Sequence, residues 1–277
     1  MLGLTTAGLV IRPVSPMGYC DHCALRKIAA DQALSEKLVT ALKAGGGTLA
    51  VSWLNLGEYA TVTDREQRLE AELLLDRLLP HVFPINVDPG VVSKREHASD
   101  PYPHADREIG ALFVKKRTVT ISASGIDLLL SASDLFEPVN HPILIRGKDR
   151  LARLTLRVLN QRRRDYATRT VFSKQVREAV RASEKAVTHT DAVVRTLAAT
   201  LFPDQRRVLT LNDAIDFHHA AVPVAFCDAV LLDGAAWDTV ERTRRNLPGI
   251  AKAFSIRGDG VERFLAYLSM PRRAGEK

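Results

Sequence analysis

Short, fully apolar runs that alternate with helical patterns are the feature that most constrains this fold. Ala229-Val-Leu-Leu232 is one such run, and Thr48 to Val51 is another. Strands of a parallel sheet read this way because helices bury them on both faces. Between the runs, apolar residues recur at three- and four-residue spacing, as they do in helices. The alternation predicts an α/β fold with a central parallel sheet flanked by helices.

Residues 17–64 read as strand, helix, strand, helix. The first strand ends at Cys20–Asp21, and a helical pattern from Leu25 to Leu42 follows it. Gly45-Gly46-Gly47 ends that helix before the second strand. Ser52 is then a good N-cap for a helix that carries Glu58.

The same alternation returns in residues 206–260. Asn212 or Asp213 is expected to cap a helix that runs towards Pro223, and the apolar run 229–232 follows it. Phe254 to Arg257 is expected to form a last strand, and 260–269 a last helix. The two α/β parts therefore belong to one domain, which we expect to span residues 1–277.

The region between them, residues 65–205, has a different character. Its patterns predict helices over 65–79, 104–116, 125–135, 149–161 and 169–201. Val82 to Val87 reads as extended chain. We expect a large, mainly helical insertion rather than an independent α/β unit.

Positive charge is concentrated in one part of that insertion. The chain has a net charge of +7, yet residues 146–185 hold thirteen Lys/Arg against four Asp/Glu, a local balance of +9. Arg153 and Arg157 share one helical stripe with Asp149, and Leu151, Leu154 and Val158 fill the opposite one. Segregated positive charge suits a polyphosphate partner, and a solvated helix face is the other interpretation.

The sequence favours neither a membrane-spanning segment nor a metal–thiolate site. The longest apolar runs are too short to cross a bilayer, and the first ten residues lack a basic n-region. We therefore predict a cytoplasmic protein with no membrane partner. Cys20-x-x-Cys23 has no second CxxC to complete a zinc ribbon, so these two and Cys227 are predicted to be buried and inert.

Acidic residues from four separated segments are expected to meet at the carboxyl edge of the sheet. Asp21 and Asp233 each follow a strand directly, and Glu58 lies on the helix that leaves the second strand. Asp216 lies on the helix before the strand 229–232, with Asp213 on the same face. Carboxylates gathered in this way repel one another unless a cation lies between them, and Mg²⁺ or Mn²⁺ suits such oxygen ligands.

Each of these acids also has a structural interpretation. Asp21 and Asp213 would serve helix N-termini, and Asp233 would be a turn residue before Gly234. Asp228 is excluded from the site by geometry, because five residues of strand separate it from Asp233 by about 16 Å. Asp213 is harder to exclude, and it is a further candidate for holding a water on the metal.

The order and spacing of these motifs resemble the PIN-domain superfamily of metal-dependent nucleases. The resemblance is carried by Asp21-His-Cys-Ala-Leu-Arg-Lys-Ile28, Ser52-Trp-Leu-Asn-Leu-Gly-Glu58, Asn212-Asp-Ala-Ile-Asp-Phe-His-His219 and Asp228-Ala-Val-Leu-Leu-Asp233. It covers residues 17–64 and 206–260, and the insertion between them is larger than a minimal PIN domain holds.

The resemblance implies a PIN-like endoribonuclease whose catalytic and metal-binding residues are Asp21, Glu58, Asp216 and Asp233. A carboxylate-held Mg²⁺ or Mn²⁺ would activate the attacking water, with Glu58 or Asp216 orienting it or taking its proton. The superfamily includes toxin ribonucleases of toxin–antitoxin pairs, so RNA, an antitoxin-like protein and a homodimer are the implied partners. Asp21→Asn is expected to abolish cleavage and leave the fold intact.

RNA needs a basic surface beside an acidic site. We expect an exposed group of arginines from the basic region to flank the acids: Arg153, Arg157, Arg162, Arg163 and Arg164. His219 would steer a phosphate or serve only the structure. The alternative function is a non-catalytic nucleic-acid-binding module that uses the basic helices of residues 146–185.

Overall fold

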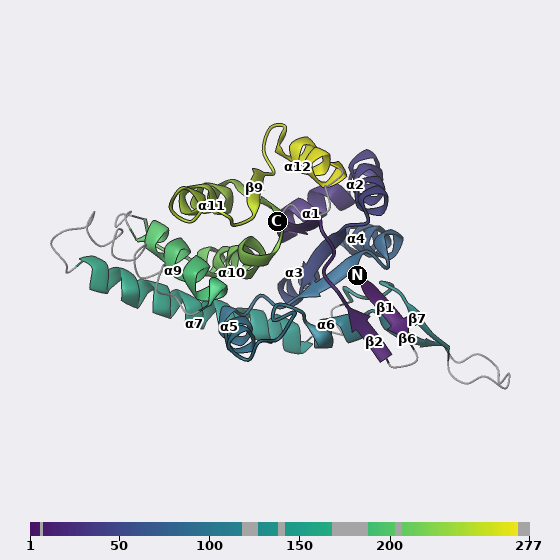
Figure 1. Cartoon of the computed structure of the whole chain (residues 1–277), viewed down its shortest axis with the longest axis horizontal. Coiled ribbons are helices and arrows are strands. Elements are labelled where there is room, and N and C mark those ends of the chain that lie inside the picture. Colours follow the sequence, from purple (N-terminus) through teal and green to yellow (C-terminus); the bar gives the residue numbers. More distant parts are fainter. Residues whose placement is uncertain (6–7, 118–126, 138–141, 168–187, 203–206, 271–277) are drawn as a thin grey trace.

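A five-stranded parallel sheet forms the centre of the protein. The computed structural model describes residues 1–5, 8–117, 127–137, 142–167, 188–202 and 207–270 (Figure 1). The strands lie in the order β5 (Val82–Ile85), β4 (Thr48–Ser52), β3 (Met17–Cys20), β8 (Ala229–Leu232) and β9 (Lys252–Ser255). The strand order reverses between the adjacent strands β3 and β8, and α/β sheets bind their ligands at such a reversal. The predicted α/β class is confirmed.

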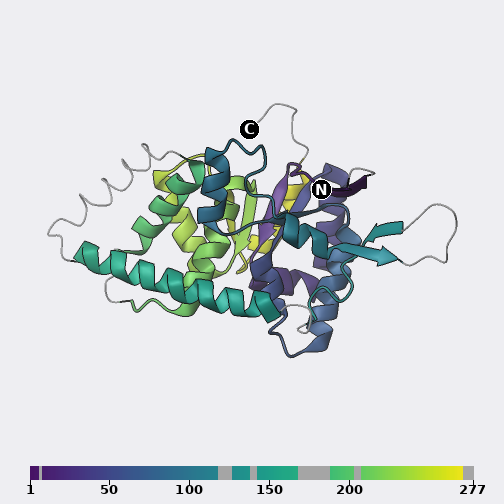
Figure 2. The same ribbon diagram turned by 90° about the horizontal axis from the view of Figure 1, so that it is seen from below.

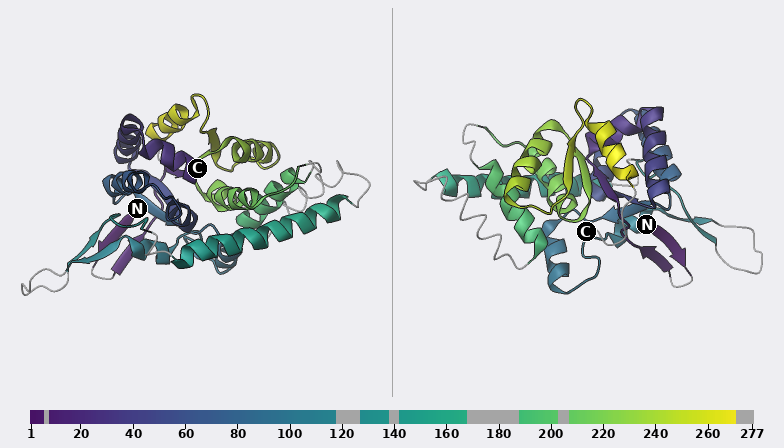
Figure 3. Two further views of the ribbon diagram at one scale, coloured as in Figure 1. Left: turned by 180° about the vertical axis from the view of Figure 1, so that it is seen from behind. Right: turned by 45° about the horizontal axis from the view of Figure 1, so that its top comes forward.

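Helices cover both faces of this sheet. One face is covered by α1 (His22–Ala29), α2 (Gln32–Gly45), α4 (Arg65–Leu78) and α12 (Gly260–Ser269). The other is covered by α10 (Leu211–Phe226) and α11 (Gly234–Asn246), with α9 (His189–Leu201) and α5 (Pro89–His97) packed against them. The short helix α3 (Trp53–Tyr59) leaves β4 at the carboxyl edge. Figure 3 shows the two helical layers on either side of the strands.

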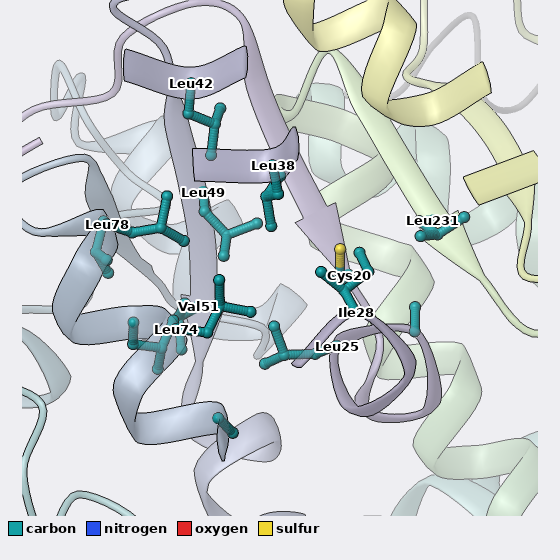
Figure 4. Packing of buried hydrophobic residues seen from close by; sticks show 14 of the residues in the cluster. Cys20, Leu25, Ile28, Leu38, Leu42, Leu49, Val51, Leu74, Leu78 and Leu231 are labelled. Atoms are coloured by element: carbon teal, nitrogen blue, oxygen red, sulfur yellow. The ribbon is translucent and has the colours of Figure 1, made fainter. Parts of the chain in front are cut away.

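Alternate residues of each strand enter different cores, which explains the continuous apolar runs. The first core lies between the sheet and the helices α1, α2, α4 and α12, and the second lies under α10 and α11 on the other face. Leu49 and Val51 of β4 belong to the first core, whereas Ala50 between them belongs to the second. Figure 4 shows Leu38 of α2 and Leu74 of α4 gathered with Leu49 and Val51 in the first core. Because both faces are covered, a strand with one polar face would bury that face without partners.

The predicted helix starts and stops are largely confirmed. Ser52 caps α3, and it forms a capping box with Asn55. Gly46 ends α2 in the left-handed conformation with φ 64°, which glycine adopts without strain. The helix predicted from Leu25 to Leu42 is in fact two helices, because a turn at Ala30 precedes Asp31, which caps α2.

The middle of the chain is mainly helical, as predicted, and it also contains one strand of the main sheet. β5 confirms the extended chain predicted over Val82 to Val87, and it completes the sheet as an edge strand. Its Pro84 directs its carbonyl outwards, where it accepts a hydrogen bond from Asp106 N at 2.9 Å. A proline is tolerated there because its missing N–H also faces away from β4.

Two helices predicted in this region differ from the structure. The helix predicted over 104–116 is confirmed only in part, because α6 covers Arg107–Leu112 and the strand β6 (Val114–Arg117) follows it. The helix predicted over 125–135 is wrong: residues 125–126 lie outside the described residues, and β7 (Asp127–Leu130) pairs antiparallel with β6. A run such as Leu128–Leu130 suits a strand as well as a helix, and only its partner strand decides between them.

The hairpin of β1 (Leu2–Thr5) and β2 (Gly8–Ile11) was not predicted. Its Leu2 is buried in the first core, and Leu2 N donates to Pro80 O at 2.9 Å. The apolar start of the chain is therefore part of the packed structure.

The basic helix α7 (Pro142–Ala167) exists, but it is rotated from the predicted orientation. It packs along α10 and α3 on the outside of the second layer (Figure 2). Leu154 and Val158 are 46% and 57% exposed, whereas Ala152, Leu159 and Arg163 are buried. The apolar stripe predicted to face inward is therefore wrong. Of the predicted helix 169–201, residues 169–187 lie outside the described residues, and α9 confirms its end.

Among the described helices, none combines the length and apolar character that a membrane-spanning helix needs.

Gly260 provides a test of how tightly α12 packs on the sheet. A Cβ added there would lie 1.9 Å from the Ser255 carbonyl oxygen, which is backbone and cannot move aside freely. Gly260→Ala is therefore expected to lower the free energy of unfolding by about 1–3 kcal/mol, measured by urea denaturation. Gly147→Ala is the control. Gly147 lies inside α7, and a Cβ added there has no other atom within 4 Å. Because alanine is favoured over glycine inside a helix, this variant should raise the free energy of unfolding by about 0.5–1 kcal/mol. Equal stability of Gly260→Ala and wild type would contradict this packing.

Candidate functional site

Asp21 joins the carboxyl ends of the two central strands. It follows β3 directly and caps α1, where its Oδ1 accepts a hydrogen bond from Ala24 N at 2.7 Å. Its Oδ2 accepts a second one from Asp233 N at 2.6 Å, beyond the end of β8. Both oxygens are thus held by backbone N–H groups, and the side chain is buried. The position predicted for Asp21 and its capping role are both confirmed.

Asp233 lies beside Asp21 at the same edge. It is the N-cap of α11, and its Oδ1 accepts from Ala236 N at 2.8 Å. The turn predicted at Asp233-Gly234 is therefore wrong, because Gly234 is the first residue of a helix. An anionic residue is favourable at this position, since helix N-termini carry unpaired N–H groups and a positive dipole end.

Asp216 faces the same edge from α10. Its carboxylate accepts no hydrogen bond from any of the described residues, and it is half-buried. Burial, reinforced by the negative charges of Asp233, Asp21 and Glu58, raises its pKa to about 7. Burial is also the main cause that raises the pKa of Asp21 to about 6. The four predicted acids therefore interact electrostatically as one acidic cluster: Asp21, Glu58, Asp216 and Asp233.

Glu58 differs from the three aspartates because a cation is paired with it. His219 Nε2 lies 2.7 Å from Glu58 Oε2, and the His219 ring is 2% exposed. Burial alone would lower the pKa of His219, but Glu58, Asp21 and Asp216 together raise it. Burial would raise the pKa of Glu58, but the His219 charge and hydrogen bond lower it. Both shifts favour the charged pair, an ionised carboxylate beside an imidazolium.

A buried hydrogen-bonded chain continues from this pair into the core. His219 Nδ1 contacts the Tyr19 hydroxyl, which lies 3.2 Å from Ser52 Oγ. The pairing of His219 with Glu58 was not predicted from the sequence. A usable signal exists, because Asp216 and His219 are three residues apart on one helix and so share a face.

Asp213 and Asp228 have structural roles. Thr210, not Asn212 or Asp213, is the N-cap of α10, and Asp213 is its capping-box partner. Asp213 Oδ2 accepts from Thr210 N at 2.7 Å, and its Oδ1 pairs with Arg207. Asp228 lies at the amino end of β8 and accepts from Met17 N at 2.7 Å. Its predicted exclusion from the carboxyl edge is confirmed.

The five arginines predicted to flank the acids lie on α7, and not all of them are exposed. Arg163 is 8% exposed, which contradicts the expected exposed surface. It occupies the face of α7 that also buries Ala152 and Leu159, because the helix is rotated from the predicted orientation. Arg153, Arg157, Arg162 and Arg164 are exposed. Lys148 is a cation of α7 that helps to lower the pKa of Glu58, and the sequence reasoning missed it.

The three cysteines differ in burial. Cys20 and Cys227 are buried in different cores, whereas Cys23 is exposed, so the prediction of three buried cysteines is wrong for Cys23. Cys23 is the second residue of α1, immediately beyond the buried end of β3.

The acidic cluster suits a divalent ion by its chemistry more than by a ready-made geometry. In the part of the chain that the structure describes, no three His, Cys, Asp or Glu side chains are arranged to hold a metal ion. The cluster nevertheless offers hard oxygen donors, and the raised pKa of Asp216 expresses a repulsion that a cation would remove. Those donors fit Mg²⁺ or Mn²⁺ better than a soft metal.

Comparisons of the chain with protein-family models, with curated proteins and with solved structures found no match. The class of this protein is therefore taken from its own architecture. It is an α/β protein with a five-stranded parallel sheet, and an acidic cluster lies where the strand order reverses.

The raised pKa of Asp216 predicts how stability depends on pH. The folded protein binds a proton on Asp216 up to about pH 7, whereas the ordinary pKa is 3.8, so stability should fall as pH rises between these values. Asp216→Asn removes this loss. In EDTA at pH 8 the free energy of unfolding of the variant should be about 1–3 kcal/mol higher than that of the wild type. The difference should disappear below about pH 4. A pH-independent difference would contradict the assigned repulsion.

The Glu58–His219 pair predicts a specific titration. His219→Gln keeps a hydrogen-bond donor near Glu58 but removes the positive charge, so the pKa of Glu58 should rise. The pKa is measured by ¹³C NMR of the carboxyl carbon, assigned by comparison with Glu58→Gln. Tyr19→Phe is the control, because it removes the hydroxyl that contacts His219 and keeps the ion pair. If both variants shift the pKa of Glu58 equally, the His219 charge is not its cause.

Proposed function

We propose that this protein is a metal-dependent nuclease of the PIN-like type that hydrolyses phosphodiester bonds in RNA. The observation that carries the proposal is Asp216, whose pKa is raised to about 7 beside Asp21, Asp233 and Glu58. Groups whose pKa is shifted by burial and by neighbouring charges are concentrated at functional sites. The four acids are also the positions that the PIN-like resemblance selects.

The chain's own residues would divide the work at this site. Asp21, Asp233, Asp216 and Glu58 would hold Mg²⁺ or Mn²⁺, which when bound would lower the pKa of a water and neutralise phosphate charge. Asp216 or Glu58 would orient the attacking water or take its proton. The oxygen of that water would add to phosphorus as one P–O ester bond breaks, and the leaving oxygen would take up a proton from solvent. His219 keeps Glu58 ionised and in a fixed orientation.

The structure also contains observations that favour the alternative, a non-catalytic nucleic-acid-binding module. Asp21 and Asp233 both cap helices, as a purely structural interpretation requires. Arg153 and Arg157 expose positive charge on α7. RNA is the proposed partner in either case. An antitoxin-like protein or a second copy of the chain stays a prediction from the resemblance.

The choice of substitution matters for testing the nuclease. Asp21 accepts two backbone N–H groups, one on each oxygen, and an asparagine amide can accept only one of them. Asp21→Asn is therefore expected to destabilise the protein as well as inactivate it, so the prediction of an intact fold needs correction. Asp216 accepts no such bond from the described residues, which makes Asp216→Asn the sharper variant.

Asp216→Asn is expected to lower the rate of RNA cleavage by about 100-fold or more in Mg²⁺ or Mn²⁺, as loss of a general base does. It should also weaken Mn²⁺ binding, measured by electron paramagnetic resonance. Asp228→Asn is the matched control at the opposite edge of the sheet, and it should cleave at close to the wild-type rate. RNA binding without cleavage by the wild type, with no Mn²⁺ bound, would favour the binding module. Unchanged cleavage by Asp216→Asn would refute the assigned role.

A further inference from the structure

A cleft opens beside the acidic cluster, at the carboxyl end of β9. Its volume is about 460 Å³, and it is lined by residues of α11, of β9 and of the segment that joins β9 to α12. Gly234 lines this cleft and directly follows Asp233. The cleft and the acidic cluster therefore adjoin along one edge of the sheet.

The cleft has an excess of positive charge. It is lined by four cations and two carboxylates: Arg244, Lys252, Arg257 and Arg263, against Glu241 and Asp259. Arg244 pairs with Glu241 at 3.1 Å, and Arg263 lies 3.9 Å from Asp259. Arg257 is exposed and has no carboxylate partner among the described residues. One guanidinium is thus available to an anion from outside.

The Arg257 side chain can lie against the start of α11 because Gly234 has no side chain there. A Cβ added to Gly234 would lie 2.8 Å from Arg257 Cζ and 2.9 Å from its Nε. The guanidinium therefore lies directly over Gly234, one residue from Asp233. An anion bound by Arg257 would lie next to the acidic cluster without entering it.

An aromatic side chain completes the cleft. Trp237 lies three residues after Gly234 on α11, so the two share a face of the helix, and Trp237 is partly exposed. An indole ring offers a stacking surface for a base, and stacking on such rings is tolerant of sequence. An unpaired guanidinium beside an indole suits a phosphate that carries a nucleoside.

We propose that this cleft is a subsite for single-stranded RNA, which binds the nucleotide next to the cleaved bond. Arg257 contacts the phosphate, and Trp237 stacks on the base. The inference rests on the proposed function, and it moves the principal substrate contact from α7 to the other side of the acidic cluster. It also accounts for Gly234 at the first position of α11, where a larger residue would displace the guanidinium.

Binding is tested without cleavage, by fluorescence anisotropy of a labelled oligouridylate with the full chain in EDTA over a range of salt concentrations. Arg257→Gln should weaken binding about 3- to 10-fold at low salt and reduce the slope of log affinity against log salt by about 0.7. Trp237→Leu should weaken binding about 5-fold or more with an unchanged slope, because it removes stacking and no charge. Arg245→Gln is the matched control. It removes the same charge from α11 outside the cleft, and it should change affinity much less.

Gly234→Ala gives an independent reading of the geometry. It should weaken binding as Arg257→Gln does, and the double variant should be no weaker than either single one, because both remove the same contact. Circular dichroism verifies that each variant is folded. An unchanged affinity and slope for Arg257→Gln would overturn the proposal, as would an equal effect of Arg245→Gln. Uridine 5′-monophosphate binding as tightly as the strand would also overturn it.

These readouts separate the two proposals. If the wild type does not cleave RNA but the cleft variants lose binding, the proposed nuclease fails and the subsite stands. If cleavage depends on Asp216 but Arg257→Gln and Trp237→Leu bind normally, the subsite fails and the nuclease stands.

Discussion

The hydrogen bond from Asp233 N to Asp21 Oδ2 is the interaction on which the arrangement of the site depends. It joins the residue after β3 to the residue after β8. Between these two adjacent strands the strand order of the sheet reverses. Asp21 also starts α1, and Asp233 starts α11, so one carboxylate sets the beginnings of helices on both faces of the sheet. A buried charged acceptor of two backbone N–H groups makes strong hydrogen bonds, and it fixes the backbone at this edge.

This rigid edge explains how charge is distributed within the acidic cluster. Glu58 is neutralised by His219, and Asp21 is stabilised by its two N–H donors. Asp216 accepts no hydrogen bond from the described residues, and burial, reinforced by the charges of Asp233, Asp21 and Glu58, raises its pKa more than that of Asp21. The acids are therefore not equivalent, although the sequence presents them alike. Their differences follow from partners that come from other elements of the fold.

The sequence predicted what local signals determine. The strands β3, β4 and β8 follow from their apolar runs, and Ser52 and Gly46 mark helix ends through their own chemistry. Asp21 and Asp233 were placed correctly because each ends a strand. What failed depends on tertiary partners. The β6–β7 pairing, the rotation of α7 and the ion pair of His219 are all decided by residues distant in the chain. Whether Asp213 belongs to the acidic site could not be decided from the sequence either, because its contacts with Arg207 and Thr210 are seen only in the fold.

Pro84 in β5 has a consequence for association between copies of the chain. The outer edge of β5 presents a proline with no N–H, and the segment around Ala105 already bridges to Ile85 there. An incoming strand would find neither the donor nor the free backbone that a continuing ladder needs. This side of the sheet is closed to growth by strand addition. Aggregation through the main sheet would have to begin at β9, the opposite edge strand.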